Sequence, residues 1–413
     1  MAKFMFFLSF FLFVLVLGDP AYDFVNVLDH GAIGDGLTDD SLAFDAAFTM
    51  ACDSSSPSVT ILVPGGSKSF LLQPMHFNGK HCRPSMIFFQ IDGYIVAPSD
   101  PNAWHRCDGE KCHAWLEFQH FDGLYIQGSG TFNGQGRNWW NPSCHQDNIV
   151  CAKKPTGFVI SHSNNVHLTG LNFEDSPQMH IAFEHSTRVY VSQLTIRAPA
   201  ESPNTDGIHI QQSSYVSIDH TFIGTGDDCV SIGDGSSHLE ITNIVCGPGH
   251  GISIGSLGKH GDKETVEYVN VRNVTFTGTQ NGVRIKTWQG GKGYAKNMMF
   301  ENIVSNGAKY PIIIDQYYCD HTHCKNQTSA VHISNITYKN IEGTSEKQIA
   351  VKLACSISTP CKNIIMENID LKPASHGEAN KFNETSSYCL NVRGRSNRHV
   401  YPKVPCLYID NNL

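Results

Sequence analysis

Val166-His167-Leu168-Thr169-Gly170-Leu171-Asn172-Phe173 is one copy of a short phrase with apolar residues at its first, third, sixth and eighth positions. Apolar residues at alternate positions predict short β-strands, and the Gly, Asn, Asp and Ser residues between them predict turns. The repeat length ranges from 23 to 33 residues. Other copies begin at Val189, Leu239, Val269, Met298, Val331 and Ile364.

A second set of short strands lies between these copies. Two sets of strands in every repeat are typical of a solenoid, in which each unit stacks on the previous one. A β-sandwich would need hairpin turns about every 8–12 residues, and the phrase does not contain them. We therefore expect an all-β, single-domain right-handed parallel β-helix. The second strands contain the pairs Ile208/Ile210, Val230/Ile232, Ile252/Ile254, Val283/Ile285 and Ile312/Ile314.

The N-terminal part of the chain differs from this repeat. Residues 1–18 combine a basic start, an apolar run and the small residue Gly18, which predicts a secretory signal peptide. Residues 19–413 would then form the β-helix domain. The segment 40–52 has an apolar helical face and a capping residue, Asp40. It predicts a short N-terminal helix that closes the open end of the solenoid.

Composition also favours export from the cell. Among the 14 cysteines are several pairs close in sequence, and none has the C-x-x-C spacing of zinc sites, so we expect disulfides. A net charge of −8 argues against a nucleic acid partner. Candidate glycosylation sites are Asn273, Asn326, Asn335 and Asn383. The expected disulfide pairs are Cys107/Cys112, Cys144/Cys151, Cys319/Cys324, Cys355/Cys361 and Cys389/Cys406.

Acidic residues and a histidine precede the second strands at matching positions. Asp206, Asp228 and His250 lie 22 residues apart, so stacking would place them in a column with a spacing of ~4.8 Å. Asp227 lies beside this column. Clustered carboxylates repel one another, so at least one should keep its proton near neutral or mildly acidic pH, as glycoside hydrolysis requires. Single aspartates are common at turns, but three in register with a histidine favour catalysis.

Two cations follow on the next strand. Arg284 and Lys286 occupy alternate positions, so both should face the side of the column and pair with a carboxylate of the substrate. Clustered acids also bind Ca²⁺, but neighbouring cations weigh against a metal site. Trp288 either stacks on a sugar ring or packs a loop.

Four motifs closely resemble the defining motifs of the polygalacturonases, the pectin-cleaving members of glycoside hydrolase family 28. The segment Gly31–Gly36 resembles the N-terminal opening of this family, and the cysteine pattern resembles that of its plant branch. The resemblance runs from about Phe24 to the C-terminus. The four motifs are Ser202–Gly207, Gly226–Asp228, Gly249–Gly251 and Arg284–Lys286.

The resemblance implies a secreted enzyme of the plant cell wall. It would hydrolyse α-1,4 bonds between galacturonic acid units with inversion at the anomeric carbon, and without a metal or another cofactor. The implied general acid is Asp227. Asp206 and Asp228 would activate the water, and His250 would tune the acid. The implied substrate-binding residues are Asn204, Arg284, Lys286 and Tyr318, with Tyr317 as the neighbouring alternative to Tyr318.

We expect a monomer that binds pectin, with no nucleic acid partner and no membrane contact after signal cleavage. Three other functions share parts of the pattern. A pectate lyase would need calcium and release unsaturated products, and a non-catalytic wall protein would bind pectin without cutting it. A rhamnogalacturonan hydrolase is a nearer alternative, but the cations favour a substrate that is acidic at every unit.

The spacing between stacked coils and the family resemblance lead to different expectations for the stereochemistry of hydrolysis. Carboxyl separations of about 5–5.5 Å are typical of retaining glycosidases, and about 6.5–9.5 Å of inverting ones. A spacing of ~4.8 Å between rungs would by itself favour retention. We give the resemblance more weight, because the orientation of a side chain changes the distance between two carboxyl groups.

Overall fold

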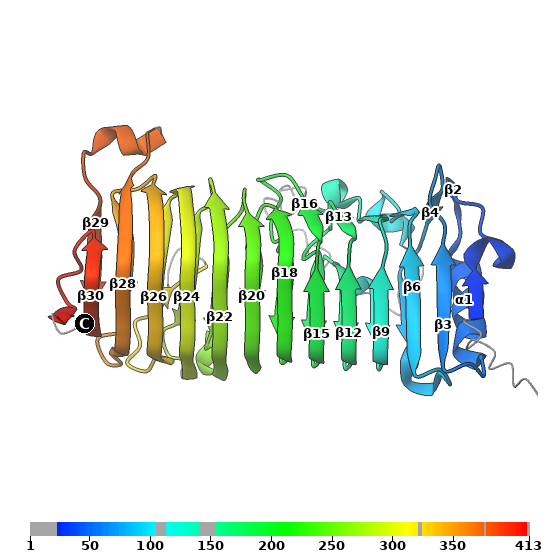
Figure 1. Cartoon of the computed structure of the whole chain (residues 1–413), viewed down its shortest axis with the longest axis horizontal. Helices are drawn as coiled ribbons and strands as arrows, with labels where there is room; N and C mark the ends of the chain where they lie inside the picture. The colour runs from blue at the N-terminus through cyan, green and yellow to red at the C-terminus, as the bar shows by residue number, and fades with distance from the viewer. Residues whose placement is uncertain (1–22, 105–112, 141–153, 321–323, 376, 411–413) are drawn as a thin grey trace, which may run out of the picture.

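The chain folds into one long stack of strands, with the N-terminal residues at one end and the C-terminal residues at the other (Figure 1). The computed structural model describes residues 23–104, 113–140, 154–320, 324–375 and 377–410. The predicted signal peptide and the pairs Cys107/Cys112 and Cys144/Cys151 lie outside the described residues. Every pairing between the named strands is parallel, and strands pair with those of the preceding and following coils. The expected right-handed parallel β-helix is confirmed.

Sheet A has 20 strands and contains the copies of the repeated phrase. In the N-terminal half each coil gives it two short strands, which become one long strand from β18 onward. Its strands are β1 (Asp23–Asn26), β2 (Asp35–Asp39), β3 (Ser58–Val63), β4 (Ser69–Leu71), β6 (Met86–Ile91), β7 (Tyr94–Val96), β9 (Asp122–Gln127), β10 (Thr131–Asn133), β12 (Asn164–Thr169), β13 (Asn172–Glu174), β15 (Thr187–Ser192), β16 (Thr195–Arg197), β18 (Ser214–Gly224), β20 (Ser236–Cys246), β22 (Lys263–Thr277), β24 (Lys292–Ala308), β26 (His332–Ser345), β28 (Cys361–Pro373), β30 (Val392–Tyr401) and β31 (Tyr408–Asp410).

Sheet B has 11 strands and contains the second set of short strands. Its strands are β5 (Met75–Asn78), β8 (Ala114–Gln119), β11 (Thr156–Ser161), β14 (Ile181–Glu184), β17 (Ile208–Gln211), β19 (Val230–Ile232), β21 (Ile252–Leu257), β23 (Asn281–Trp288), β25 (Tyr310–Tyr318), β27 (Ile349–Ala354) and β29 (Ser386–Leu390). The short 3-10 helices are η1 (Val27–His30), η2 (Gly79–His81), η3 (Pro101–Ala103), η4 (Gly136–Trp139), η6 (Lys259–Gly261) and η7 (Gly377–Lys381).

The core is a column of apolar side chains enclosed by the two sheets. In sheet B, Ile208, Val230 and Ile252 pair with one another in register, and Val283 follows on the next strand. All four are fully or almost fully buried. Because residues of a strand point alternately to its two faces, the residues between them face outward. This alternation places the residues of the candidate site on the outer face of sheet B.

One copy of the phrase was assigned to the wrong position. Met298 pairs with Ile336 rather than Val331, and Phe300 pairs with Tyr338. The apolar residues at 331 and 333 lie immediately before and at the start of β26 and imitate the phrase five residues too early. The stack also extends before the first named copy of the phrase at Val166, since β1, β3, β6 and β9 already pair in sequence.

The predicted N-terminal helix is α1 (Ser41–Asp53), which lies at the N-terminal end of the stack (Figure 1). Phe44 packs edge-on against Phe70, and Phe48 packs against Phe77. Asp40 precedes the helix, but its side chain does not cap it. The carboxylate of Asp40 instead accepts hydrogen bonds from the backbone N–H groups of Ile33 and Gly34, and so holds the preceding loop.

Disulfides tie several turns to the coils. Three of the expected pairs, Cys319–Cys324, Cys355–Cys361 and Cys389–Cys406, are present. The sequence did not indicate the pairs Cys52–Cys82 and Cys229–Cys246. No helix within the described ranges is long and apolar enough to cross a membrane.

Candidate active site

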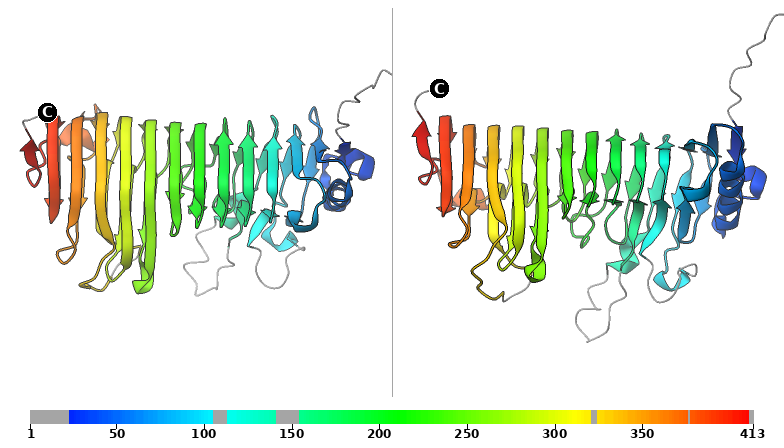
Figure 2. Two further views of the ribbon diagram at one scale, coloured as in Figure 1. Left: turned by 60° about the horizontal axis from the view of Figure 1, so that its bottom comes forward. Right: turned by 90° about the horizontal axis from the view of Figure 1, so that it is seen from below.

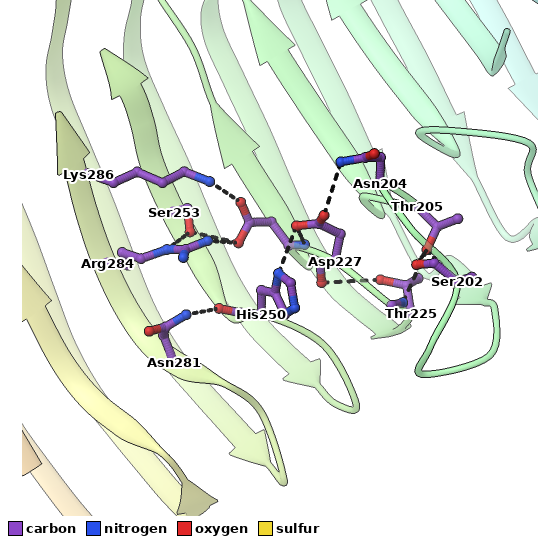
Figure 3. A network of polar contacts seen from close by, with 12 residues as sticks. Ser202, Asn204, Thr205, Thr225, Asp227, His250, Ser253, Asn281, Arg284 and Lys286 are labelled. Carbon is purple, nitrogen blue, oxygen red and sulfur yellow. Dashed lines mark hydrogen bonds and ion pairs between the residues drawn. The ribbon is translucent and has the colours of Figure 1, made fainter. Parts of the chain in front are cut away.

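All eight predicted site residues line one hollow on the outer side of sheet B. The segment 204–286, green to yellow-green in Figure 2, lies near the middle of the stack. Figure 3 shows five of the eight residues close together: Asn204, Asp227, His250, Arg284 and Lys286. The loops that precede β17, β19 and β21 carry the motifs with Asp206, Asp228 and His250. Because the strands pair in register, these three residues occupy the same position on successive coils. The lining residues are Met179, Asn204, Asp206, His209, Asp227, Asp228, Ser231, His250, Gly255, Gln280, Arg284, Lys286 and Tyr318.

Asp227 is held by partners on the neighbouring loops. Its Oδ1 atom lies 2.9 Å from Nδ1 of His250 and accepts a 2.8 Å hydrogen bond from the backbone N–H of Asp228. Its Oδ2 atom lies 3.5 Å from the amide nitrogen of Asn204. The backbone N–H of His250 donates to the carbonyl of Asp227 at 2.7 Å. Asp227 therefore has a fixed orientation and remains partly accessible to solvent, with 18% of its side chain exposed.

Asp228 is buried and fully paired. Its Oδ1 atom accepts hydrogen bonds from Ser253 at 2.7 Å and from Arg284 at 2.8 Å, and its Oδ2 atom accepts one from Lys286 at 2.9 Å. Burial opposes ionisation, but Lys286 and Arg284 outweigh it and lower the pKa of Asp228 to about 2. Asp228 is therefore an anion at any pH at which the protein would work.

Asp206 is also buried, but no cation contacts it directly. Burial, followed by the negative charges of Asp227 and Asp228, raises the pKa of Asp206 to about 7. This agrees with the expectation that one carboxyl of the cluster keeps its proton. The site thus contains two neighbouring carboxyl groups of opposite character, one permanently ionised and one that titrates near neutral pH.

Two glycines allow the loops that carry the site residues to pack closely against the backbone of neighbouring coils. A Cβ atom on Gly226 would lie 2.0 Å from the carbonyl oxygen of Ser202, and one on Gly251 would lie 2.3 Å from the carbonyl oxygen of Asn281. Gly251 also has a φ of +91°, in the region that favours glycine. The disulfide Cys229–Cys246 joins the residue after Asp228 to the strand that leads to His250.

Tyr318 lines the C-terminal side of the hollow. The Nζ atom of Lys286 lies 5.5 Å from the centre of the Tyr318 ring. Tyr317 points elsewhere, since its hydroxyl lies 3.4 Å from the carbonyl of Cys355 and accepts a hydrogen bond from the backbone of Ile357. Trp288 is 7% exposed and packs edge-on against Tyr318. Of the two alternatives for Trp288, the structure supports the packing role.

Sequence reasoning did not identify five residues that line the hollow, nor Ser253, which holds Asp228. The five are Met179, His209, Ser231, Gly255 and Gln280. A signal for three of these residues, Ser253 included, was present. His209, Ser231 and Ser253 each follow the column residue of their own coil by three positions. The same offset places their side chains on the outer face of sheet B beside the carboxylates.

Asp227, Asp228 and His250 form a group of potential metal ligands. Their potential ligand atoms lie within 4.8 Å of one another. However, both oxygens of Asp228 already accept hydrogen bonds from Arg284 and Lys286, so a divalent cation would have to displace or oppose two positive charges. The arrangement therefore fits an anionic ligand better than a cation.

Comparisons with known proteins agree with the motifs. Residues 52–398 match the family model "Glycosyl hydrolases family 28". A protein of Arabidopsis thaliana named as a probable polygalacturonase is 45% identical over 94% of this chain and 85% of its own length. Polygalacturonase-2 of Solanum lycopersicum is 44% identical over 93% of this chain and 81% of its own length.

A solved structure shows the same architecture. The endo-xylogalacturonan hydrolase of Aspergillus tubingensis superposes with a TM-score of 0.75 at 25% identity, over 89% of this chain and 96% of the other. The match to the family model, the curated relatives and the geometry of the site all lead to the same assignment. The chain belongs to glycosyl hydrolases family 28.

Proposed function

We propose that the protein hydrolyses the α-1,4 bonds of polygalacturonic acid, the acidic backbone of pectin. The observation that carries this proposal is the cluster of three carboxyl groups with two cations in one hollow. Curated relatives that are 44–45% identical over most of the chain are named as polygalacturonases, which supports the same substrate. The fit of the donor set to an anion disfavours calcium-dependent elimination.

Asp227 would act as the general acid that protonates the leaving oxygen. It is the carboxyl group of the three that remains partly exposed, and His250 and Asn204 fix its orientation. Asp206 and Asp228 would hold the attacking water and take its proton. In this scheme Asp228 contributes a permanent negative charge, and Asp206 is the group whose protonation changes near neutral pH.

Arg284, Lys286 and Tyr318 would bind a galacturonate unit. Both cations contact Asp228, and each side chain is still 11% exposed toward the hollow. Each keeps further N–H donors for a uronate carboxylate. Because the same cations hold Asp228, substrate binding and the charge of Asp228 are coupled through Arg284 and Lys286.

The protein would act outside the cell as a monomer in the plant cell wall, without a metal or another cofactor. The disulfides of the described residues support an oxidising compartment, as do the names of the plant relatives. The predicted signal peptide would direct the chain there. The four predicted glycosylation sites are consistent with the same route.

The test is digestion of de-esterified polygalacturonate in EDTA, with the products separated by length and monitored for reducing ends and ultraviolet absorbance. The wild-type protein should release saturated oligomers or monomer. Asp227→Asn should lower kcat by at least about 100-fold, the usual contribution of a general acid, without changing the melting temperature much. Asp234→Asn is a matched control outside the hollow and should keep wild-type turnover.

Two outcomes would contradict this proposal. A folded Asp227→Asn protein with most of its activity would remove Asp227 from the mechanism. Unsaturated products that appear only after calcium is restored would replace hydrolysis by elimination.

A further inference from the structure

Four polar residues form a row across the outer face of sheet B. His209 on β17 pairs in register with Ser231 on β19, which pairs with Ser253 on β21, which pairs with Arg284 on β23. Two serines thus lie in the middle of the row, with a titratable base at one end and a permanent cation at the other. The row runs directly beside Asp206 and Asp228.

The half of the row that contains Arg284 has one possible arrangement of hydrogens. Nε of Arg284 donates to the Ser253 hydroxyl at 2.8 Å, because an arginine N–H is always a donor. The Ser253 hydroxyl therefore points its own hydrogen at Oδ1 of Asp228, 2.7 Å away. The permanent charge of Arg284 reaches Asp228 directly and through Ser253.

The half that contains His209 repeats this geometry with a group that can lose its proton. Nδ1 of His209 lies 2.8 Å from the Ser231 hydroxyl, which also hydrogen bonds to the carboxyl group of Asp206. Ser231 is 3% exposed and Asp206 8%, so water has little access to this chain of contacts. Ser231 has only one hydrogen, and it can point either to Asp206 or to His209.

We propose that His209 is a positioning residue of the reaction, which acts through the Ser231 hydroxyl to set whether Asp206 is a carboxylate able to activate water. This inference rests on the proposed function, since it assigns Asp206 the role of a base. When Nδ1 of His209 carries a proton, Ser231 accepts from it and donates to ionised Asp206. When Nδ1 lacks a proton, Ser231 donates to His209 and accepts from protonated Asp206.

The two arrangements differ by the transfer of one proton. The proton of Asp206 passes to Oγ of Ser231, the hydroxyl proton of Ser231 passes to Nδ1 of His209, and the serine ends unchanged. Neutral His209 becomes imidazolium and the carboxylic acid becomes carboxylate, so atoms and charge balance. The site can therefore produce the water-activating carboxylate without exchanging a proton with bulk solvent.

The surroundings of this relay contain several other charged groups. Glu184 on β14 faces His209 from the other side and favours its protonated form, as does Asp228, whereas Lys286 and burial oppose it. Burial is the largest of these effects and lowers the pKa of His209. Glu184 in turn lies 3.4 Å from His113. Asp206 faces Asp227, Asp228 and Lys286.

The experiment is a double-mutant cycle on His209 and Ser231, with kcat and KM measured on polygalacturonate from about pH 4.5 to 7.5. Ser231→Ala removes the hydrogen bond to Asp206, so the limb on which activity rises with pH should move up by about one pH unit. At pH 5 this would cost about ten-fold in kcat/KM, with KM nearly unchanged. His209→Ala should move the limb in the same direction.

Coupling and rescue separate this role from a general structural effect. If His209 acts through Ser231, the double variant should be no worse than Ser231→Ala alone. His209→Asn should place the limb between those of His209→Ala and the wild type, because its side-chain N–H can donate to Ser231 but its amide cannot take up the proton of Asp206. His238→Gln, on the outer side of sheet A, where the ring stacks on Tyr215, should leave the profile unchanged.

Additive effects, unchanged pH profiles, or a rise in KM alone for His209→Ala would overturn the inference. These results leave the proposed function intact as long as the wild-type protein hydrolyses polygalacturonate. An inactive wild-type protein would instead reject the proposed function. Melting temperatures of all variants show whether a loss of activity comes from unfolding.

Discussion

Asp206 and Asp228 occupy equivalent positions on neighbouring coils, yet their environments drive them to opposite states. The difference arises on β23, two strands beyond the β19 strand that Asp228 precedes, where Arg284 and Lys286 both reach Asp228. Asp206 receives a serine and, through it, a histidine. The same repeated backbone therefore carries two chemically distinct carboxyl groups, because different side chains lie beside each of them on the outer face of sheet B.

The burial of Asp206 has a cost in stability that depends on pH. An unfolded aspartate has a pKa of about 3.9, whereas in the folded protein the pKa of Asp206 is raised to about 7. Between these values the unfolded chain loses a proton that the folded chain keeps, so stability falls as pH rises through this window. Asp206→Asn should therefore have a higher melting temperature than the wild type at pH 7, a similar one at pH 4, and almost no activity.

Asp228→Asn provides the matched opposite case. The pKa of Asp228 is lowered, so its contribution to stability is present above about pH 4 and lost as the pH falls toward 2. Its replacement leaves Arg284 and Lys286 without their shared anion, and should lower the melting temperature at pH 7. Equal melting temperatures for both variants at pH 7 would show that the two carboxyl groups do not differ as described.

The sequence was sufficient to predict that the site residues lie together. Each column residue lies at the same distance in sequence before the apolar pair of its strand, and the pairing of these strands determines the register. The sequence was not sufficient to predict the partners of the site residues. Arg284 and Lys286 were expected to pair with a carboxylate of the substrate, whereas in the structure both form ion pairs with Asp228. This choice depends on the distance between neighbouring coils and on the length of each side chain. Neither is visible in a linear motif.

At the level of the elements, the corners of sheet A are formed by residues with positive φ. Asn243, Asn273, Asn302, Asn340 and Asn368 all have φ between +52° and +55°. Their side chains form a ladder along the stack, with each amide donating to the carbonyl oxygen of the asparagine before it at 2.9–3.2 Å. The ladder provides hydrogen-bond partners for the asparagine side chains at the exposed corner, and each coil repeats the same backbone bend there.

Substitutions at Asn302 separate the two contributions of this ladder. Asn302→Ala removes hydrogen bonds to Asn273 and Asn340 and places an alanine at a φ of +55°, so the free energy of unfolding should fall by about 1–3 kcal/mol. Asn302→Gly loses the same hydrogen bonds but tolerates the backbone conformation, so it should be destabilised less. Thermal unfolding measures both. A glycine variant that is less stable than the alanine variant would reject the backbone part of this explanation.

The elements also show where periodicity misleads. The β-helix, its two sets of strands and the capping helix followed from alternation and helical periodicity alone. The copy placed at Val331 was wrong because Val331 and Ile333, immediately before and at the start of β26, have the same spacing as the apolar residues of the phrase. No copy of the phrase was noted before Val166, although β3 and β6 already bury apolar residues at alternate positions. These residues are Val59, Ile61, Ile87 and Phe89.

For the whole molecule, the shape of sheet B determines how an extended polymer meets the site. Its 11 parallel strands form a continuous face along the stack, and the hollow lies near the middle of this face. Asp227 and Asp228 are neighbours in sequence, yet their side chains diverge. Asp227 contacts Asn204 and His250 on the adjoining loops (Figure 3). Asp228 instead accepts hydrogen bonds from Arg284 and Lys286 on β23.

Carboxylate oxygens of Asp227 and Asp228 lie within 4.8 Å of one another, so the distance between these carboxyl groups by itself still favours retention. Asp227 nevertheless leaves the column in which Asp206 and Asp228 lie and faces Asn204 and His250. A water molecule can then attack from the side of Asp206 and Asp228 while Asp227 protonates the leaving group, so we expect inversion. Proton NMR at high enzyme concentration should show the β-anomer at new reducing ends before mutarotation. If the α-anomer forms first, a carboxylate acts as a nucleophile, and a covalent intermediate should be trapped on one of the three aspartates.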